Sequence, residues 1–438
     1  MFEKNRTQTS SKIHRNTYLR HPMANAGKII NDPVHGFITI PPGTIQEVVD
    51  HPYFQRLRRI KQLGLTDLVY PGAHHTRFHH ALGAMHLMGL ALETLKEKGH
   101  EISKEEEEGA RLAVLLHDIG HGPFSHALES SILQGVPHEM LSLAFMERLN
   151  FLFGNRLDTA IQIFKGKYHR PFFNQLVSGQ LDLDRMDYLR RDCFFTGVAE
   201  GAISAERILK MIDIHQDELV VEDKAIYSVE NFLSSRRLMY WQVYLHKTTV
   251  SAEEMLIQLM RRARTLMDRG MQISMPFHLQ AFFEKRFGLM DFLSEPSHLN
   301  TFSMLDDYDI WFCIKNWVNH PDYVLSYLSR GLMDRRLLKV QISSSPMAMI
   351  ELEHIRKEYE TELGISSDDV TYLVFEKEVS NSAYISGGNR INVKFRSGDI
   401  IDLVEATDLP NINGMTTVVK KYIVCQPKNI SLQPFAGK

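Results

Sequence analysis

Apolar side chains recur every three or four residues along most of the first 270 positions, which is the period of an amphipathic helix. The spacing predicts a helix from about residue 43 that Pro52 interrupts, a second helix from Thr76 through Leu95, and a third that begins near residue 104. Ser103 followed by Glu106 forms a capping box at the start of this third helix. Further helices are predicted over residues 138–163, 180–192, 204–213 and 228–270.

The pattern changes towards the C-terminus. Residues 275–362 are still mostly helical but richer in turns, and after residue 368 short alternating apolar runs predict strands. These runs are Tyr372–Phe375, the residues Ile391, Val393 and Phe395, and the segment from Val418 to Val424. A further short extended piece with turn residues is predicted at 28–36. We therefore expect a mainly α protein with a flexible tail at 1–24, a helical body at 25–270 and a smaller C-terminal α+β region at 271–438.

Composition narrows the class of protein. The chain of 438 residues has a formal net charge of −3, which argues against a broad nucleic-acid-binding surface. Its three cysteines are too few and too scattered for a disulfide framework, which favours a reducing compartment. The sequence has no apolar run long enough for a membrane span and no hydrophobic signal core at its N-terminus. These features predict a cytoplasmic protein that does not associate with a membrane.

One stretch, Leu115–His126, concentrates residues that bind metals. His117 and Asp118 follow an apolar run directly. The glycines and the proline after them break the helix and place His121 and His126 in the same neighbourhood. Imidazole and carboxylate together suit iron, manganese, zinc or magnesium, and the pair leaves coordination positions to be filled from elsewhere. Taken alone, however, a His-Asp pair at a helix end is more often a helix cap than a metal site.

Two other segments supply complementary chemistry. His80 precedes His117 by 37 positions, which is enough for one helix hairpin to bring the two imidazoles together. Farther along the chain, Asp184, Tyr188 and Asp192 follow one another at intervals of four residues and so share one helix face. A carboxylate, a phenol and a second carboxylate on one stripe fit a polar pocket better than a core.

With these motifs, residues from about 28 to 247 resemble the HD-domain phosphohydrolase family, named for its His-Asp pair, and in particular its deoxynucleoside triphosphate triphosphohydrolase (dNTPase) branch. The resemblance implies an HD-type catalytic domain at 25–270 and an HD-associated region at 271–438. It also implies that one divalent ion is held by His80, His117, Asp118 and Asp184. Two nitrogens and two oxygens suit Mn, Fe, Ni or Zn, and suit Mg less well.

The resemblance also implies catalytic groups. His121, His126 and His138 resemble the family's catalytic histidines, with Glu129 and Glu139 as acidic partners. Glu129 lies three residues after His126, where it can hold that imidazole protonated as a general acid for the departing 5′ oxygen.

Substrate contacts follow from the same comparison. The dipeptide Gln62-Leu63 matches the one that contacts the sugar 3′-hydroxyl and crowds the 2′ position in dNTPases, and Tyr188 and Asp192 would complete this sugar pocket. A mammalian dNTPase has histidine at the position aligned with Tyr240, so base preference is not transferred. Cations for the phosphates, and a stripe of arginine and tyrosine at intervals of four residues, complete the expected set: Arg77, Arg185, Lys247, Arg236, Tyr240 and Tyr244.

The dNTPases of this branch carry a regulatory guanine-nucleotide site, usually between subunits. The residues that match it are Lys28, Asn31, Asp50, Gln55 and Arg58, and His246 and Lys247 match its deoxynucleotide part. The resemblance thus implies a homo-oligomer, dimer or tetramer, that hydrolyses dNTPs, with dGTP as one candidate, to deoxynucleoside and tripolyphosphate, and it makes activation by a guanine nucleotide a hypothesis. The alternatives are a phosphomonoesterase or phosphodiesterase of the same superfamily acting on another nucleotide, and a nucleotide-sensing binding protein.

Overall fold

The computed structural model describes residues 27–125, 127, 128, 133, 135–381, 390–407 and 419–428. The tail predicted at residues 1–24 lies outside this range. The described chain begins with an antiparallel hairpin of β1 (Lys28–Asp32) and β2 (Gly36–Ile40), where an extended piece was expected. The helix expected from residue 43 is divided into α1 (Thr44–Asp50), α2 (Pro52–Gln55) and the 3-10 turn η1 (Arg56–Arg59), because Pro52 starts a new helix.

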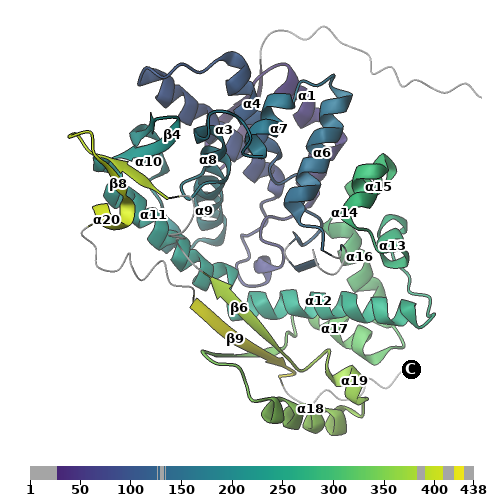
Figure 1. Cartoon of the computed structure of the whole chain (residues 1–438). Coiled ribbons are helices and arrows are strands. Elements are labelled where there is room, and N and C mark those ends of the chain that lie inside the picture. The colour runs from purple at the N-terminus through teal and green to yellow at the C-terminus, as the bar shows by residue number, and fades with distance from the viewer. Residues whose placement is uncertain are drawn as a thin grey trace, which may run out of the picture.

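The centre of the body is made by α3 (Arg77–Glu97), α4 (Lys104–Leu116) and α9 (Leu183–Thr196), with both α4 and α9 packed on α3 (Figure 1). The predicted capping box is present, since Ser103 Oγ accepts the Glu106 N–H at 3.1 Å and the Glu106 carboxylate accepts the Ser103 N–H at 2.8 Å. The cap fixes the start of α4, and the helix ends at Leu116, so the His-Asp pair follows directly after its last turn.

Several predicted helices are shorter than expected. The segment 138–163 forms α6 (His138–Leu152) and α7 (Asp158–Phe164), separated where Gly154 and Asn155 take positive φ. The segment 228–270 is divided by a π-helical turn, η5 (Tyr240–Tyr244), between α11 (Ile226–Met239) and α12 (Lys247–Asp268). The remaining short helices of the body are η2 (Thr66–Leu68), α8 (Phe172–Ser178), η3 (Ala199–Gly201), α10 (Ala205–Met211) and η4 (Asp223–Ala225).

Two sheets contain residues from the C-terminal region. The helix predicted to run to residue 213 ends at Met211 and continues as β3 (Ile212–His215), which pairs with β4 (Glu218–Glu222). The strands β7 (Asn392–Lys394) and β8 (Ile400–Asp402) extend this hairpin to the order β3-β4-β7-β8, with β4 and β7 parallel. The second sheet is antiparallel in the order β5-β9-β6, formed by β5 (Lys339–Ser343), β9 (Val419–Gln426) and β6 (Phe375–Asn381).

The mainly α fold and the smaller C-terminal α+β region are therefore confirmed. The strand expected at 372–375 starts only at Phe375, because Tyr372 and Leu373 lie in a turn. Helix α12 runs beneath the body in Figure 1, between it and the sheet of β6 and β9. Among the described helices, none combines the length and hydrophobicity that crossing a membrane requires. The other C-terminal helices are α13 (Phe277–Glu284), α14 (Leu289–Ser294), α15 (Pro296–Ser303), α16 (Asp307–Trp317), α17 (Tyr323–Met333), α18 (Met349–Leu363), α19 (Ser367–Val370) and α20 (Leu403–Ala406).

Candidate metal centre and substrate cavity

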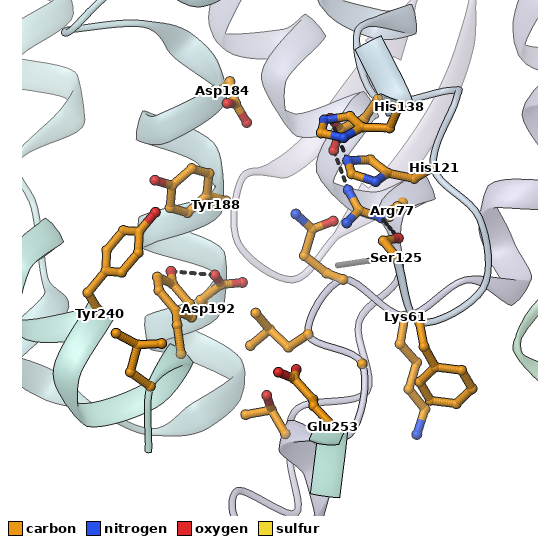
Figure 2. Close-up of a pocket in the computed structure, with 18 residues that line it drawn as sticks. Lys61, Arg77, His121, Ser125, His138, Asp184, Tyr188, Asp192, Tyr240 and Glu253 are labelled. Carbon is orange, nitrogen blue, oxygen red and sulfur yellow. Dashed lines mark hydrogen bonds and ion pairs between the residues drawn. The ribbon is translucent and has the colours of Figure 1, made fainter. Parts of the chain in front are cut away.

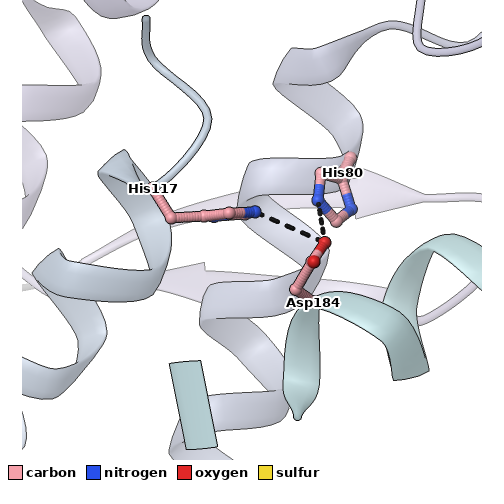
Figure 3. Close-up of side chains that lie close together, drawn as sticks. All are labelled: His80, His117 and Asp184. Atoms are coloured by element: carbon pink, nitrogen blue, oxygen red, sulfur yellow. Dashed lines mark ion pairs between the residues drawn. The ribbon is translucent and has the colours of Figure 1, made fainter. Parts of the chain in front are cut away.

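Three of the predicted metal ligands converge from three helices. Figure 3 shows His80 from α3, His117 from the end of α4 and Asp184 from the first turn of α9 pointing towards one another. Asp184 Oδ1 lies 3.1 Å from His80 Nε2 and 3.3 Å from His117 Nε2, and the three ligand atoms lie within 4.8 Å of one another. Both Nε2 atoms are buried and have no hydrogen-bond partner among the described residues, which leaves them available to a cation.

The far nitrogens of both imidazoles are fixed by other groups. Asp187, also on α9, accepts from His80 Nδ1 at 2.8 Å and is itself held by Arg191 at 2.9 Å. His117 Nδ1 lies 2.6 Å from the carbonyl oxygen of Val114, one turn earlier in α4. Such partners fix the ring orientation of metal-binding histidines, so that each Nε2 faces the centre.

The fourth predicted ligand, Asp118, lies beside this trio. Its carboxylate oxygens are 3.3 Å from His117 Nε2 and 3.8 Å from His80 Nε2. In the structure it also accepts from Arg77 Nη1 at 2.5 Å and lies 3.3 Å from His121 Nε2. Asp118 therefore stands between the metal-ligand group and the cationic side of the neighbouring cavity.

The electrostatics favour a bound cation. Burial lowers the pKa of His80, but the carboxylates of Asp184 and Asp187 outweigh it and raise this pKa to about 10. In the same way, Asp118 and Asp184 overcome burial and raise the pKa of His117 to about 9. A cluster that attracts protons this strongly also attracts a metal ion, which binds by replacing them. The donor set and its charge thus fit one divalent transition metal ion.

A cavity of about 410 Å³ opens beside this centre (Figure 2). The sequence-predicted residues that line it are Gln62, Leu63, Arg77, Asp118, His121, His138, Asp184, Tyr188, Asp192, Tyr240 and Tyr244. Sequence reasoning missed seven further lining residues, which are Lys61, Gly64, Thr66, Phe124, Ser125, Leu245 and Glu253. The cavity therefore joins the metal-ligand group to most of the residues expected to contact substrate.

One wall of the cavity is aromatic and acidic. Figure 2 shows Tyr188, Tyr240 and Asp192 on the wall that faces Arg77. The Tyr244 hydroxyl donates to Asp192 at 2.6 Å. The rings of Tyr244 and Tyr240 pack edge to face, with their centres 5.2 Å apart. The π-helical turn at 240–244 produces this arrangement, since it ends α11 and directs its tyrosines towards α9.

The opposite wall holds the loop that follows the His-Asp pair. The ring of His121 stacks on that of His138 at 3.8 Å, and Arg77 Nε donates to Ser125 Oγ at 3.1 Å. Gly120 makes this stacking feasible, because a Cβ at that position would lie 2.2 Å from the carbonyl oxygen of His138. His126 and Glu129 lie outside the described residues, so their catalytic roles stay predictions.

Four other predicted residues do not line this cavity. Arg185 is ion-paired with Asp182 and donates to the Gly179 carbonyl oxygen. The side chain of Glu139 is 60% exposed, although its carboxylate lies 3.4 Å from His138 Nε2. Arg236 is buried, close enough to Tyr188 on the cavity wall for its charge to lower the pKa of that phenol against the effect of burial. Lys247 lines a separate, neighbouring cavity together with His246.

The residues predicted for a regulatory nucleotide form two contacts at the protein surface. Lys28 on β1, the strand that also carries Asn31, pairs with Asp50 at 2.5 Å. Arg58 Nε donates to Gln55 Oε1 at 2.8 Å and the guanidinium lies 3.5 Å from the centre of the Phe78 ring.

A helical domain that gathers two histidines and two carboxylates beside a cavity with arginine and further histidines defines a metal-dependent phosphohydrolase of the His-Asp class. The HD domain family matches residues 77–192, and the HD associated region matches residues 203–274. The structure is similar to that of a phosphohydrolase from Bacteroides thetaiotaomicron, with a TM-score of 0.88 and 48% identity over 92% of this chain and all of that one. The chain is 35% identical to YwfO of Bacillus subtilis over 71% of each protein.

The protein therefore belongs to the HD-domain phosphohydrolase family, which confirms the resemblance seen in the sequence. It is also 33% identical, over 254 residues, to the deoxynucleoside triphosphate triphosphohydrolase SAMHD1 homolog of Dictyostelium discoideum. That match covers 53% of this chain and 48% of the relative, so the chain spans about half the length of this relative.

Proposed function

We propose that this phosphohydrolase cleaves deoxynucleoside triphosphates to deoxynucleoside and tripolyphosphate. The observation that carries the proposal is a single cavity that runs from the metal-ligand group past Gln62 and Leu63 to the tyrosine wall. Such a cavity offers a place for phosphates at one end and for a sugar without a 2′-hydroxyl in the middle. The relatives named as deoxynucleoside triphosphate triphosphohydrolases support this choice of substrate.

We propose His80, His117, Asp118 and Asp184 as the ligands of the metal. When bound, a divalent ion stabilises charge on a phosphoryl oxygen and lowers the pKa of water to about 7. The protein's own groups orient the substrate around it. Arg77, held at the cavity wall by Asp118 and Ser125, offers planar N–H donors that match phosphate oxygens.

The two stacked histidines complete the phosphate end of the cavity. His121 Nε2 lies beside Asp118 and faces the cavity, where it can hydrogen-bond a phosphoryl oxygen. On the other wall, Asp192 is fixed by Tyr244 at 2.6 Å and by His75 at 2.7 Å, so its oxygens are held in place for a sugar hydroxyl. We assign the general acid at the leaving 5′ oxygen to His126 on the family resemblance alone.

The test is turnover of each dNTP, dGTP among them, by the purified protein with Mn, Fe, Ni, Zn or Mg, with and without GTP. The proposal predicts metal-dependent release of deoxynucleoside, and Asp118→Ala is the matched inactive control. Stimulation by GTP, together with a shift to a larger species in size-exclusion chromatography, would support the regulatory site at Lys28, Asn31, Asp50, Gln55 and Arg58. Hydrolysis of phosphomonoesters or phosphodiesters with no action on dNTPs would instead favour another activity of the superfamily.

A further inference from the structure

The end of the cavity farthest from the metal-ligand group is built by residues that no motif singled out. Figure 2 shows Asp184 and His138 at one end of the cavity and Glu253 at the other. Glu253 belongs to the second turn of α12, which starts three residues after Tyr244. Its Oε1 lies 3.8 Å from the position that a Cβ would take on Gly64, so the carboxyl group covers the chain just beyond Gln62-Leu63.

The carboxyl group of Glu253 has no protein partner among the described residues. Lys377, whose charge acts on Glu253, pairs with the adjacent Glu254 at 3.3 Å. Lys61, which lines the same cavity, pairs with Asp67 at 2.8 Å. The side chain is partly buried and lines the cavity, so its carboxyl oxygens are free to hydrogen-bond a ligand that enters. Its position therefore points to a polar group of the substrate.

We propose that Glu253 is the residue that distinguishes between nucleobases in this cavity. The inference rests on the proposed dNTP substrate. With the triphosphate at the metal-ligand group and the sugar between Gln62-Leu63 and the tyrosine wall, the base is directed to the end where Glu253 lies. This residue would then contact the base edge directly and act as a specificity-determining residue, without a part in the chemical step.

The base that Glu253 prefers depends on whether its carboxyl group is ionised or neutral. An ionised carboxylate only accepts hydrogen bonds and so matches the two adjacent donors of guanine, the ring N–H and the amino group. A neutral carboxyl group donates once and accepts once, which matches the amino group and adjacent ring nitrogen of adenine or cytosine. Burial, reinforced by Glu254 and opposed by Lys377, raises the pKa of Glu253 to about 8. At neutral pH we therefore expect adenine or cytosine to be favoured, and guanine to gain as the pH passes about 8.

The test compares kcat/KM for dATP, dCTP, dGTP and dTTP at pH 6.5 and pH 9 in the wild-type enzyme and in Glu253→Gln. Glutamine keeps the shape and the donor–acceptor pattern of the neutral acid but cannot ionise. In the wild type we expect the dGTP/dATP ratio of kcat/KM to rise about tenfold between these pH values, as expected for one hydrogen bond to a charged group. In Glu253→Gln we expect the ratio to stay at its low-pH value.

Glu254→Gln is the matched control, because Glu254 is the next residue on the same helix, pairs with Lys377 and does not line the cavity. It should keep the rise of the base ratio between pH 6.5 and pH 9, with a midpoint at lower pH, because Glu254 helps to raise the pKa of Glu253. If the enzyme turns over dNTPs and Glu253→Gln has the same base ratios as the wild type at both pH values, the inference is wrong while the proposed function stands. If no dNTP is turned over, the proposed function fails. The inference is then tested by calorimetric Kd values for the four dNTPs in the wild type and in Glu253→Gln at pH 6.5 and pH 9, and it is wrong if the two proteins have the same ratios of Kd between bases.

Discussion

Asp307 connects the C-terminal region to two loops that line the cavity, and replacing it with alanine tests whether that connection serves catalysis. The residue is the first of α16 and is buried. One carboxylate oxygen accepts the backbone N–H of Lys61 at 2.8 Å and the other accepts that of Phe124 at 3.0 Å. Lys61 precedes the predicted sugar-binding dipeptide Gln62-Leu63, and Phe124 precedes Ser125, which bonds Arg77. A single side chain thus fixes the position of these two loops relative to each other.

The structure indicates that stability changes less than activity in Asp307→Ala. Each buried N–H left without an acceptor costs about 1–3 kcal/mol. Burial raises the pKa of Asp307 to about 6, so at pH 7 the ionised form is roughly 3 kcal/mol less favourable to folding than the neutral acid, and removing the buried charge offsets part of the loss. The two N–H groups together set an upper bound of about 6 kcal/mol, and the net destabilisation is smaller than this, within the roughly 5–15 kcal/mol by which folded proteins are stable.

Activity should fall further, because a displacement of about 1 Å in positioning groups can lower the rate by about 100-fold. The assay is kcat and KM of the folded variant, with urea denaturation measured in parallel. Asp306→Asn is the control, since asparagine still caps α16 and leaves both backbone contacts of Asp307 in place. It removes the ion pair with the half-exposed Arg59 and the attraction to the buried Arg56, so the control reports the loss of a neighbouring charge. A folded Asp307→Ala enzyme with unchanged kcat and KM would refute the reasoning.

Three further predictions follow from the metal centre and from Asp307. Asp118→Ala should lose both metal and activity, and full metal occupancy by elemental analysis would contradict its assignment as a ligand. Asp187→Asn should lower metal affinity by about 10- to 100-fold, because His80 loses the carboxylate that orients its ring; calorimetric titration with Mn²⁺ measures this, and unchanged affinity would mean that the ring is held by packing. Because the pKa of Asp307 in the folded state is raised above its unfolded value of about 3.9, its contribution to stability is complete below about pH 4 and is lost as the pH rises through about 6. The unfolding free energy of the wild type relative to Asp307→Asn should therefore fall between pH 4.5 and pH 7.5, and a pH-independent difference would show that the group is not titrating in this window.

The helices that carry the metal ligands could be predicted from sequence because their signals are local. The apolar period and the capping box at Ser103 placed the start of α4, and spacing by four residues placed Asp184, Tyr188 and Asp192 on one face of α9. That His80 and Asp184 would meet the His-Asp pair followed from the family resemblance, since periodicity does not specify which helices contact one another.

What the sequence could not show depends on contacts between distant parts of the chain. The hairpin of β3 and β4 turns at Gln216 and Asp217, which both take positive φ, a conformation that non-glycine residues rarely adopt. The bonds of Asp307 span 246 and 183 positions and leave no local pattern. Glu253 sits in a helix rich in charged residues and looks like part of its solvated face until the fold places it in the cavity.

The position of the cut in the substrate tests the central claim most directly. The protein, loaded with Mn²⁺, would be incubated with a dNTP in ¹⁸O-labelled water, and the products followed by ³¹P nuclear magnetic resonance and mass spectrometry. Attack of water on the α-phosphorus with departure of the 5′ oxygen predicts unlabelled deoxynucleoside and tripolyphosphate that carries one ¹⁸O on a terminal phosphorus. Release of deoxynucleoside monophosphate with pyrophosphate, or of orthophosphate alone, would contradict it.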